Sequence, residues 1–208
     1  MNVAGYGISL QRLEPPDLER LRNWRNEPSL VRHLEFQTYI TPEMQQAWYL
    51  RINNLSNYYF MIKVGQESIG LIHLANVTRA QAEAGLFIGA QQFWGTSFAV
   101  RASLCLLDFA FETLALKEVW AKVNPTNTVA WSYNEQLGFQ YWRPAENPDF
   151  SLLQLTAGDY FLNPLRVQAK RLFPQPLTLD FNPAQPLDQL VLWDLNNRSA
   201  TSDKNPQK

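Results

Sequence analysis

Residues 92–101 read Gln92-Phe-Trp-Gly95-Thr-Ser97-Phe-Ala-Val-Arg101. They join an apolar run, Ala84 to Ala90, to a helical pattern of apolar residues from Phe98 to Leu114. A strand that turns through Gly and small polar residues into a helix leaves backbone N–H groups unpaired at the helix start. With the positive end of the helix dipole, these groups form a site for phosphates. The segment therefore predicts a phosphate-binding turn between a strand and a helix.

A second motif lies downstream on another short predicted helix. It reads Asn127-x-x-Ala130 and closes with Leu137-Gly138-Phe139, where Gly follows the last helical turn. In this order and at this separation, the two motifs resemble those of the GNAT superfamily of acetyl-CoA-dependent N-acetyltransferases. The phosphate-binding turn of that family reads Gln/Arg-x-x-Gly-x-Gly/Ala. Here the last small position is Ser97, a departure that still keeps the side chain small.

The order of predicted elements is also similar to that superfamily: one strand, the N-terminal helices, three strands, a helix, a strand, a helix and two strands. The expected strands are 8–13, 58–64, 68–77, 83–89, 118–123, 139–142 and 151–155. The expected helices are 17–24, 29–34, 41–52, 97–114 and 126–137. The resemblance covers roughly Ile8 to Leu162. It implies an α/β (α+β) GNAT fold, with a central mixed, mostly antiparallel sheet flanked by helices.

Length and composition agree with an ordinary enzyme domain. The chain has 208 residues, of which 46% are apolar and 18% are charged, and this balance favours a packed globule over disorder. The formal net charge is −1, so nothing suggests a broad nucleic-acid or anionic-membrane surface. No apolar run reaches the ~20 residues that a membrane-spanning helix needs. The N-terminus lacks the basic start and apolar core of a signal peptide, and we expect the protein in the cytoplasm.

The chain offers few metal ligands. Its single cysteine, Cys105, lies inside an apolar helical pattern, where a buried, apolar role is the expectation. With two histidines, His33 and His73, and one cysteine, a structural zinc site is not expected, and we predict no metal.

The C-terminal part differs from the rest, and we divide the chain into an acetyltransferase domain, 1–163, and a proline-rich extension, 164–208. Prolines interrupt any long element in this extension: Pro164, Pro174, Pro176, Pro183, Pro186 and Pro206. Residues 177–181 and 187–195 are apolar enough to pack on the domain or to engage a partner. From Asn196 onward the sequence is polar, and disorder is expected there.

The resemblance implies acetyl-CoA as co-substrate and assigns residues to it. Its diphosphate would meet the turn, and its pantetheine arm would lie along the preceding strand at Phe87 and Ile88. Asn127 would face the cofactor from the start of the second helix. The predicted residues of the turn are Gln92, Trp94, Gly95, Thr96, Ser97, Phe98 and Ala99.

Glu83 is the candidate general base. It begins the strand that points at the phosphate turn, and the segment Glu83-Ala-Gly-Leu-Phe-Ile resembles the strand of the superfamily that often carries a Glu near the amine. A carboxylate there would take the amine proton directly or through water. The alternative is a solvated charge at the end of a strand.

The proton donor departs from the family pattern. Many members place a Tyr seven residues after the Asn, and that position here is Asn134, with Tyr133 one residue earlier. One residue is about 100° around a helix. Asn127, Ala130 and Asn134 share one stripe, whereas Tyr133 aligns with Val129 and Leu137 on a stripe that is typical of a core. Tyr133 is therefore a packed aromatic or the thiolate acid, and in the first case Asn134 or water would assist departure of the thiolate.

The acceptor would lie near the two N-terminal helices and the hairpin. Trp24-Arg25-Asn26, Val31-Arg32 and Gln45-x-x-Trp48 resemble the subgroup that contains ribosomal-protein N-terminal acetyltransferases and amino-sugar N-acetyltransferases. The substrate-binding candidates are Arg25, Arg32, Trp48 and Tyr59. Arg25 and Arg32 would meet a phosphate or carboxylate, or else form salt bridges within the protein. His33 and His73 are lesser candidates for a base.

The function that these observations favour is acetyl transfer from acetyl-CoA to a primary amine, with an amino sugar or a nucleotide-linked amine as acceptor. Acetylation of a protein N-terminus is the alternative within the enzyme class. A protein that binds acyl-CoA without catalysis is the alternative outside it. The expected partners are a small-molecule amine or a peptide N-terminus, with neither nucleic acid nor membrane, and a homodimer is one option.

Overall fold

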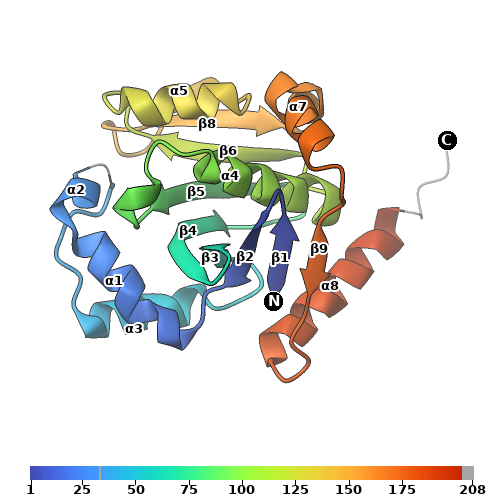
Figure 1. Cartoon of the computed structure of the whole chain (residues 1–208), viewed down its shortest axis with the longest axis horizontal. Helices are drawn as coiled ribbons and strands as arrows, with labels where there is room; N and C mark the ends of the chain where they lie inside the picture. The colour runs from blue at the N-terminus through green and yellow to red at the C-terminus, as the bar shows by residue number, and fades with distance from the viewer. Residues whose placement is uncertain (33, 203–208) are drawn as a thin grey trace.

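Figure 1 shows the computed structural model, in which helices lie on both faces of a sheet; the structure describes residues 1–32 and 34–202. Within these residues nine strands form one sheet, in the order β7-β8-β6-β5-β4-β3-β2-β1-β9. The strands are β1 (Asn2–Gly5), β2 (Ile8–Arg12), β3 (Tyr58–Val64), β4 (Glu67–Ala75), β5 (Gln81–Ile88), β6 (Glu118–Val123), β7 (Gln140–Pro144), β8 (Ser151–Thr156) and β9 (Thr178–Asp180). Neighbours are antiparallel except for β5 and β6, which are parallel. The expected mixed, mostly antiparallel sheet is confirmed.

The helices within the described residues are α1 (Leu18–Asn26), α2 (Pro28–Val31), α3 (Pro42–Ile52), α4 (Phe98–Asp108), α5 (Thr128–Gln136), α6 (Ala157–Leu162), α7 (Pro164–Leu172) and α8 (Pro186–Ser202). The five predicted helices are present and start within about two residues of the expected positions, whereas α6, α7 and α8 were not expected. Thr41 caps α3, because its hydroxyl accepts the N–H of Met44 at 3.3 Å. Helix α4 is shorter than expected, since it passes at Phe109–Thr113 into a π-helical turn.

The two faces of the sheet carry separate apolar cores. Phe60 and Ile62 of β3 belong to the larger core, whereas Met61 between them belongs to the smaller one. Successive side chains of a strand point to opposite faces, so the two cores lie on opposite sides of the sheet. Helices α4 and α5 cover the larger core, where Cys105 is fully buried as predicted. Helices α1 and α3 cover the smaller core.

The sequence missed both elements at one sheet edge. Strand β1 was not expected, and it pairs with β2 and, on its other side, with β9, where Asn2 lies opposite Asp180. Residues 178–180 therefore complete the sheet, and Figure 1 shows α8 running beside β9. Val191 of α8 is fully buried in the larger core. The division of the chain at residue 163 stays a prediction.

The expectation of disorder from Asn196 is wrong as far as Ser202. Helix α8 continues through this stretch, and residues 203–208 lie outside the described part of the chain. Pro186 was interpreted as an interruption. It stands instead at the first position of α8, where a proline has no N–H bond to lose.

A buried carboxylate joins the N-terminal hairpin, α4 and the C-terminal helices. Asp108 has no exposed surface and accepts hydrogen bonds from Tyr6 at 2.5 Å and Tyr160 at 2.8 Å. It also forms ion pairs with Arg166 at 3.0 Å and Lys170 at 2.7 Å, both of α7. Burial alone raises the pKa of Asp108, but the hydrogen bonds from these four residues outweigh it, and the pKa lies below its usual value. The ionised form is therefore stabilised by the folded state.

We expect Asp108→Asn to lower the free energy of unfolding by about 3–5 kcal/mol, because it leaves Lys170 without its carboxylate partner and Arg166 with only the partly exposed Glu112. The matched control is Glu112→Gln, which removes a carboxylate from the same Arg166 but is 39% exposed, and which should cost less than about 1 kcal/mol. Urea unfolding measures both. The pKa of Asp108 is lowered by folding, so the difference between wild type and Asp108→Asn should be full above about pH 4 and shrink as the pH falls through the lowered value. Equal losses in the two variants would contradict this assignment.

Candidate active site

The parallel strands β5 and β6 are paired over only part of their length. Gln81 to Ala84 pair with Glu118 to Ala121, and beyond Ala84 the strands separate. In the part of the chain that the structure describes, the edge of β5 from Gly85 to Ile88 has no strand partner on this side, although β4 continues to pair on the other. Helices α4 and α5 follow β5 and β6 in sequence, so their N-termini lie where the strands part.

The turn between β5 and α4 has the unpaired backbone that the sequence predicts. A 3₁₀ turn, Gln91–Phe93, is followed by Gly95 with φ of +73° and then by α4. Among the described residues, the N–H groups of Gly95, Ser97, Ala99 and Val100 donate to no acceptor. A Cβ on Gly95 would meet no atom within 4 Å, so the turn faces open space. These four donors at a helix N-terminus are suited to a diphosphate.

Other predicted residues of the turn are engaged within the protein. The backbone N–H of Trp94 donates to Gln91, and its indole N–H donates to the carbonyl of Ile88 at 2.8 Å. The Gln92 amide donates to Glu67 at 2.8 Å, and the Thr96 hydroxyl donates to the Phe93 carbonyl at 2.7 Å. The Phe98 ring packs against that of Phe93, 5.6 Å away. These contacts fix the shape of the turn.

Helix α5 holds the second motif. Asn127 is its N-cap, since the side-chain oxygen accepts the Ala130 N–H at 3.0 Å. The Asn134 amide donates to the Ala130 carbonyl at 2.8 Å. Asn127, Ala130 and Asn134 are all half-buried, which is consistent with one shared stripe. Val129 was predicted on the core stripe, and this is wrong because Val129 is 80% exposed.

Tyr133 is held against α4. Its hydroxyl donates to the Ala99 carbonyl at 2.9 Å and lies 2.7 Å from the Ser103 hydroxyl. Burial raises the pKa of Tyr133, and the hydrogen bond with Ser103 offsets part of that increase. The phenolic proton is thus engaged by a helix carbonyl, as expected for a packed aromatic.

On the opposite face of the sheet, a half-buried cluster is formed by Arg25, Trp48, Tyr59, His73 and Glu83, and we call it the acceptor chamber for the role that the sequence predicts. Tyr59 stacks on His73 with ring centroids 4.6 Å apart, and Trp48 meets Tyr59 edge-on at 5.1 Å. The Arg25 guanidinium lies over the Trp48 ring at 5.7 Å. Three of the four predicted substrate-binding residues are therefore together.

Two glycines, Gly85 in β5 and Gly89 just after it, let aromatic side chains pack directly on the backbone. A Cβ on Gly85 would lie 2.6 Å from the His73 imidazole, and one on Gly89 would lie 2.1 Å from the Trp24 indole. Real Cβ atoms do not approach so closely, so these side chains require glycine beneath them. The floor of the chamber is consequently made of backbone at Gly85 of β5 and at Gly89 just after it.

The ionisation states in the chamber differ between its members. Burial, with the charge of Arg25, lowers the pKa of His73 to about 4, and the imidazole is neutral near pH 7. Burial raises the pKa of Glu83; Lys122 lowers it, Glu35 raises it, and a hydrogen bond with Asn76 lowers it. The balance is a raised pKa, which brings this carboxylate closer to the range of a general base.

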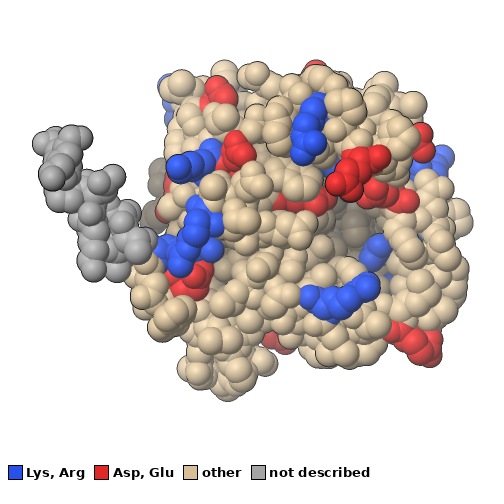
Figure 2. Space-filling model, turned by 180° about the vertical axis from the view of Figure 1, so that it is seen from behind, with Lys and Arg blue, Asp and Glu red and all other residues tan. Residues whose placement is uncertain are grey.

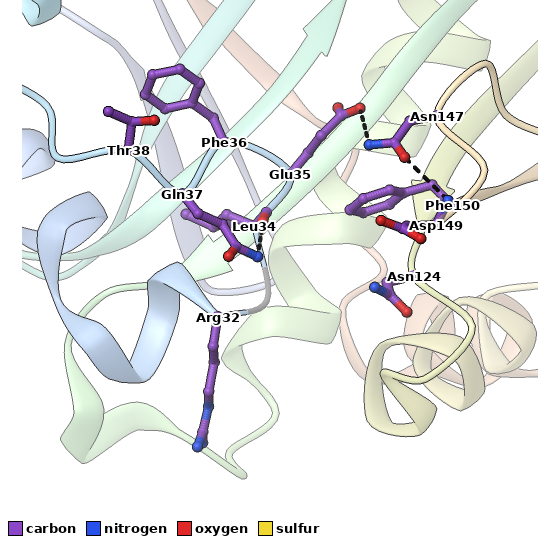
Figure 3. Close-up of a pocket in the computed structure, with 10 residues that line it drawn as sticks. All are labelled: Arg32, Leu34, Glu35, Phe36, Gln37, Thr38, Asn124, Asn147, Asp149 and Phe150. Carbon is purple, nitrogen blue, oxygen red and sulfur yellow. Dashed lines mark hydrogen bonds between the residues drawn. The ribbon is translucent and has the colours of Figure 1, made fainter.

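The charges of Lys122 and Glu35 act on Glu83, and Glu35 lines a cavity of about 540 Å³. Lys122 forms an ion pair with Glu35 at 2.9 Å, and Glu35 accepts a hydrogen bond from Asn147 at 3.4 Å. Figure 3 shows Glu35 pointing at Asn147 across the cavity, while the Arg32 side chain points away from both. The cavity is lined by Arg32, Leu34, Glu35, Phe36, Gln37, Thr38, Asn124, Asn147, Asp149 and Phe150. Figure 2 shows a hollow on the rear face of the molecule, flanked by acidic and basic side chains.

Sequence reasoning missed Lys122 and Glu35. Trp120 and Lys122 alternate with buried residues along β6, and this pattern indicates that their side chains share one face of the sheet. The parallel register that places Lys122 relative to β5 could not be predicted from the sequence. Arg32, predicted to bind substrate, lines the cavity of about 540 Å³, and His33 lies outside the described residues. The described part of the chain contains neither a group of three possible metal ligands nor a helix long and apolar enough to cross a membrane.

Comparisons with known proteins agree with this geometry. Residues 8–140 match the model of the acetyltransferase (GNAT) domain family, and the chain belongs to that family. It is accordingly an N-acetyltransferase of the GNAT type, a family that uses acetyl-CoA.

Individual relatives match this chain at low sequence identity. An uncharacterized N-acetyltransferase p20 of Bacillus licheniformis is 26% identical over 141 residues, which cover 64% of this chain and 79% of that protein. The spermidine N(1)-acetyltransferase of Escherichia coli K12 is 24% identical over 138 residues, covering 65% and 74%. The crystal structure of spermidine N-acetyltransferase from Vibrio cholerae, in complex with CoA and spermine, aligns with a TM-score of 0.68 at 22% identity, over 74% of this chain and 98% of that one.

We expect Tyr133→Phe to retain most of the turnover, because its hydroxyl is engaged by α4. Loss of the hydroxyl should lower the free energy of unfolding by about 1 kcal/mol. Ser103→Ala removes a partner of the same hydroxyl and is the matched control, so its stability loss should be similar and non-additive with that of Tyr133→Phe. Steady-state kinetics and urea unfolding test both. A fall in kcat of about 100-fold or more in a folded Tyr133→Phe variant would instead make Tyr133 the general acid.

Proposed function

We propose that this protein transfers the acetyl group of acetyl-CoA to the primary amine of a small molecule, by direct attack of the amine on the thioester. The observation that carries the proposal is the separation of β5 from β6. Beyond this separation, β5 runs on to the turn with its four unpaired N–H groups. Where the separation begins, β5 carries Glu83 beside the acceptor chamber. Both substrates would then meet along β5.

The residues present fit the co-substrate. Acetyl-CoA supplies the acetyl group as a thioester, which an unprotonated amine attacks without a covalent enzyme intermediate. The N–H groups of Gly95, Ser97, Ala99 and Val100 would bind the diphosphate. The unpaired edge of β5, at Phe87 and Ile88, is available to the pantetheine arm, although the Ile88 carbonyl already accepts the Trp94 indole N–H.

Glu83 would act as the general base. Its carboxylate would accept, directly or through one water, the proton that the acceptor loses as the new N–C bond forms and the C–S bond breaks. The hydroxyl of Tyr133 is engaged by Ala99, so departure of the sulfur would be assisted by Asn134 or by water. One amide hydrogen of Asn134 is used within α5, and the second is available for this role.

For the acceptor, we favour an amino sugar or a nucleotide-linked amine. The Trp48 and Tyr59 rings of the chamber suit a compact, ring-shaped molecule. A polyamine is the acceptor class that the names of the Escherichia coli and Vibrio cholerae relatives suggest. A protein N-terminus is the remaining enzymatic alternative, and binding of acyl-CoA without catalysis is the non-enzymatic one.

The test is release of free thiol from acetyl-CoA in the presence of amino sugars, polyamines and Ala- or Ser-starting peptides. We expect turnover with a small amine and a fall in kcat of about 100-fold or more in Glu83→Gln. Glu118→Gln is the control, because this glutamate lies on the adjacent strand β6 and is engaged by Gln154 at 2.7 Å. Calorimetry should show unchanged coenzyme binding in both variants. Coenzyme binding without turnover on any acceptor would favour the non-catalytic alternative.

The charges around Glu83 allow a second test of its role. Lys122 lowers the pKa of Glu83 and Glu35 raises it. A base must be ionised, so activity falls as the pH drops through this pKa. Lys122→Met should therefore move the acid limb of the kcat/KM profile to higher pH, and Glu35→Gln should move it to lower pH. If both variants shift the limb in one direction, or neither shifts it, another group is the base.

A further inference from the structure

Arg25 is a half-buried cation without a counter-charge. Its guanidinium lies over the Trp48 ring, and within the described residues it makes neither an ion pair nor a hydrogen bond. Burial lowers the pKa of Arg25, which reflects the cost of holding an unpaired charge away from water. Arginines so placed are usually matched by a carboxylate, and this one is not.

The neighbours of Arg25 in the chamber do not supply the missing charge. His73 is neutral at pH 7, and burial, with the charge of Glu83, raises the pKa of Tyr59 to about 12, so its hydroxyl stays protonated. Glu83 is the acid of the chamber, and it interacts with Lys122 and Asn76. A planar guanidinium that keeps its donors unused in a half-buried site is suited to bind an oxyanion.

The chamber also fixes an order of groups. The charges of Glu83 and Arg25 both act on the Tyr59 hydroxyl, because Glu83 raises its pKa and Arg25 lowers it. The Arg25 guanidinium lies over Trp48, Trp48 meets Tyr59 edge-on, and Tyr59 stacks on His73. In the pairing of β4 with β5, His73 lies opposite Gly85, two residues from Glu83, so the stacked pair has the guanidinium of α1 and the strand of the carboxylate as neighbours. A molecule that spans the pair would present an amine to Glu83 and an anionic group to Arg25.

We propose, on the basis of the proposed function, that the amine acceptor carries an oxyanion, a carboxylate or a phosphate, which the Arg25 guanidinium binds across the stacked rings of Tyr59 and His73. A polycation such as spermidine would bring positive charge against an arginine that has no counter-charge of its own. Arg25 thus selects anionic amines over polyamines.

The experiment compares acceptors that differ only in the anionic group. Glucosamine is paired with glucosamine 6-phosphate, and 3-aminopropanol with 3-aminopropanoate, while spermidine serves as the polycation. We expect the wild type to prefer the anionic member of one pair by at least about tenfold in kcat/KM, the scale of one hydrogen bond to a charged group. The pair that shows the preference distinguishes phosphate from carboxylate.

Variants assign the preference to Arg25. In Arg25→Gln the preference should disappear, because KM for the anionic member rises much more than KM for the neutral member. Arg25→Lys should restore part of it, since it keeps the charge but not the planar fork. Arg51→Gln is the control, because Arg51 is an exposed arginine on α3. Coenzyme binding by calorimetry shows that each variant is folded.

The two proposals fail in different ways. Turnover that favours neutral amines or spermidine, and that Arg25→Gln leaves unchanged, would overturn the oxyanion inference and leave the acetyltransferase function intact. A wild type that binds coenzyme and acetylates none of these acceptors would overturn both.

Discussion

The buried carboxylate of Asp108 joins segments that are distant in sequence. It stands at the last residue of α4, and it holds Tyr6 of the first hairpin, Tyr160 of α6 and two cations of α7. Tyr6 has a positive φ of 55°, which is uncommon for a tyrosine, and its hydrogen bond to Asp108 helps to keep it there. The same helix carries at its other end the turn with four unpaired N–H groups. Fixing the C-terminal end of α4 thus fixes the position of the anion site at its start.

Strand β5 is the second constraint, because it belongs to every part of the proposed site. Its pairing with β4 is continuous, its pairing with β6 stops at Ala84, and its far end enters the phosphate turn. One of its faces bears Glu83 and the floor of the acceptor chamber. The other belongs to the larger core through Leu86 and Ile88. Proton acceptance, coenzyme binding and acceptor recognition would then share one rigid element, which is the arrangement that favours productive alignment of two substrates.

The sequence predicted what depends on local chemistry. The turn at Gly95 between a strand and a helix, the helix that begins near Thr41 and the order of the central strands along the chain follow from residues that are close together in the sequence. The Lys122–Glu35 ion pair was not predictable, because it depends on the register of β6 and on the path of the loop after α2. Strand β9 has three residues, too few for an alternating pattern, and α8 was hidden by a proline that in fact starts it. The prediction for Val129 was wrong because helical spacing shows which residues share one face of a helix, but not which part of that face packs against the core.

The glycines beneath His73 and Trp24 bear on how such a site can change its substrate. Because the chamber floor is backbone at Gly85 of β5 and at Gly89 just after it, any larger residue there would displace an aromatic ring. The other side of the chamber is formed by side chains of α1 and α3, at Arg25 and Trp48. Redesign of acceptor specificity, in the laboratory or in evolution, would therefore proceed by exchanging the helical cover over a constant strand.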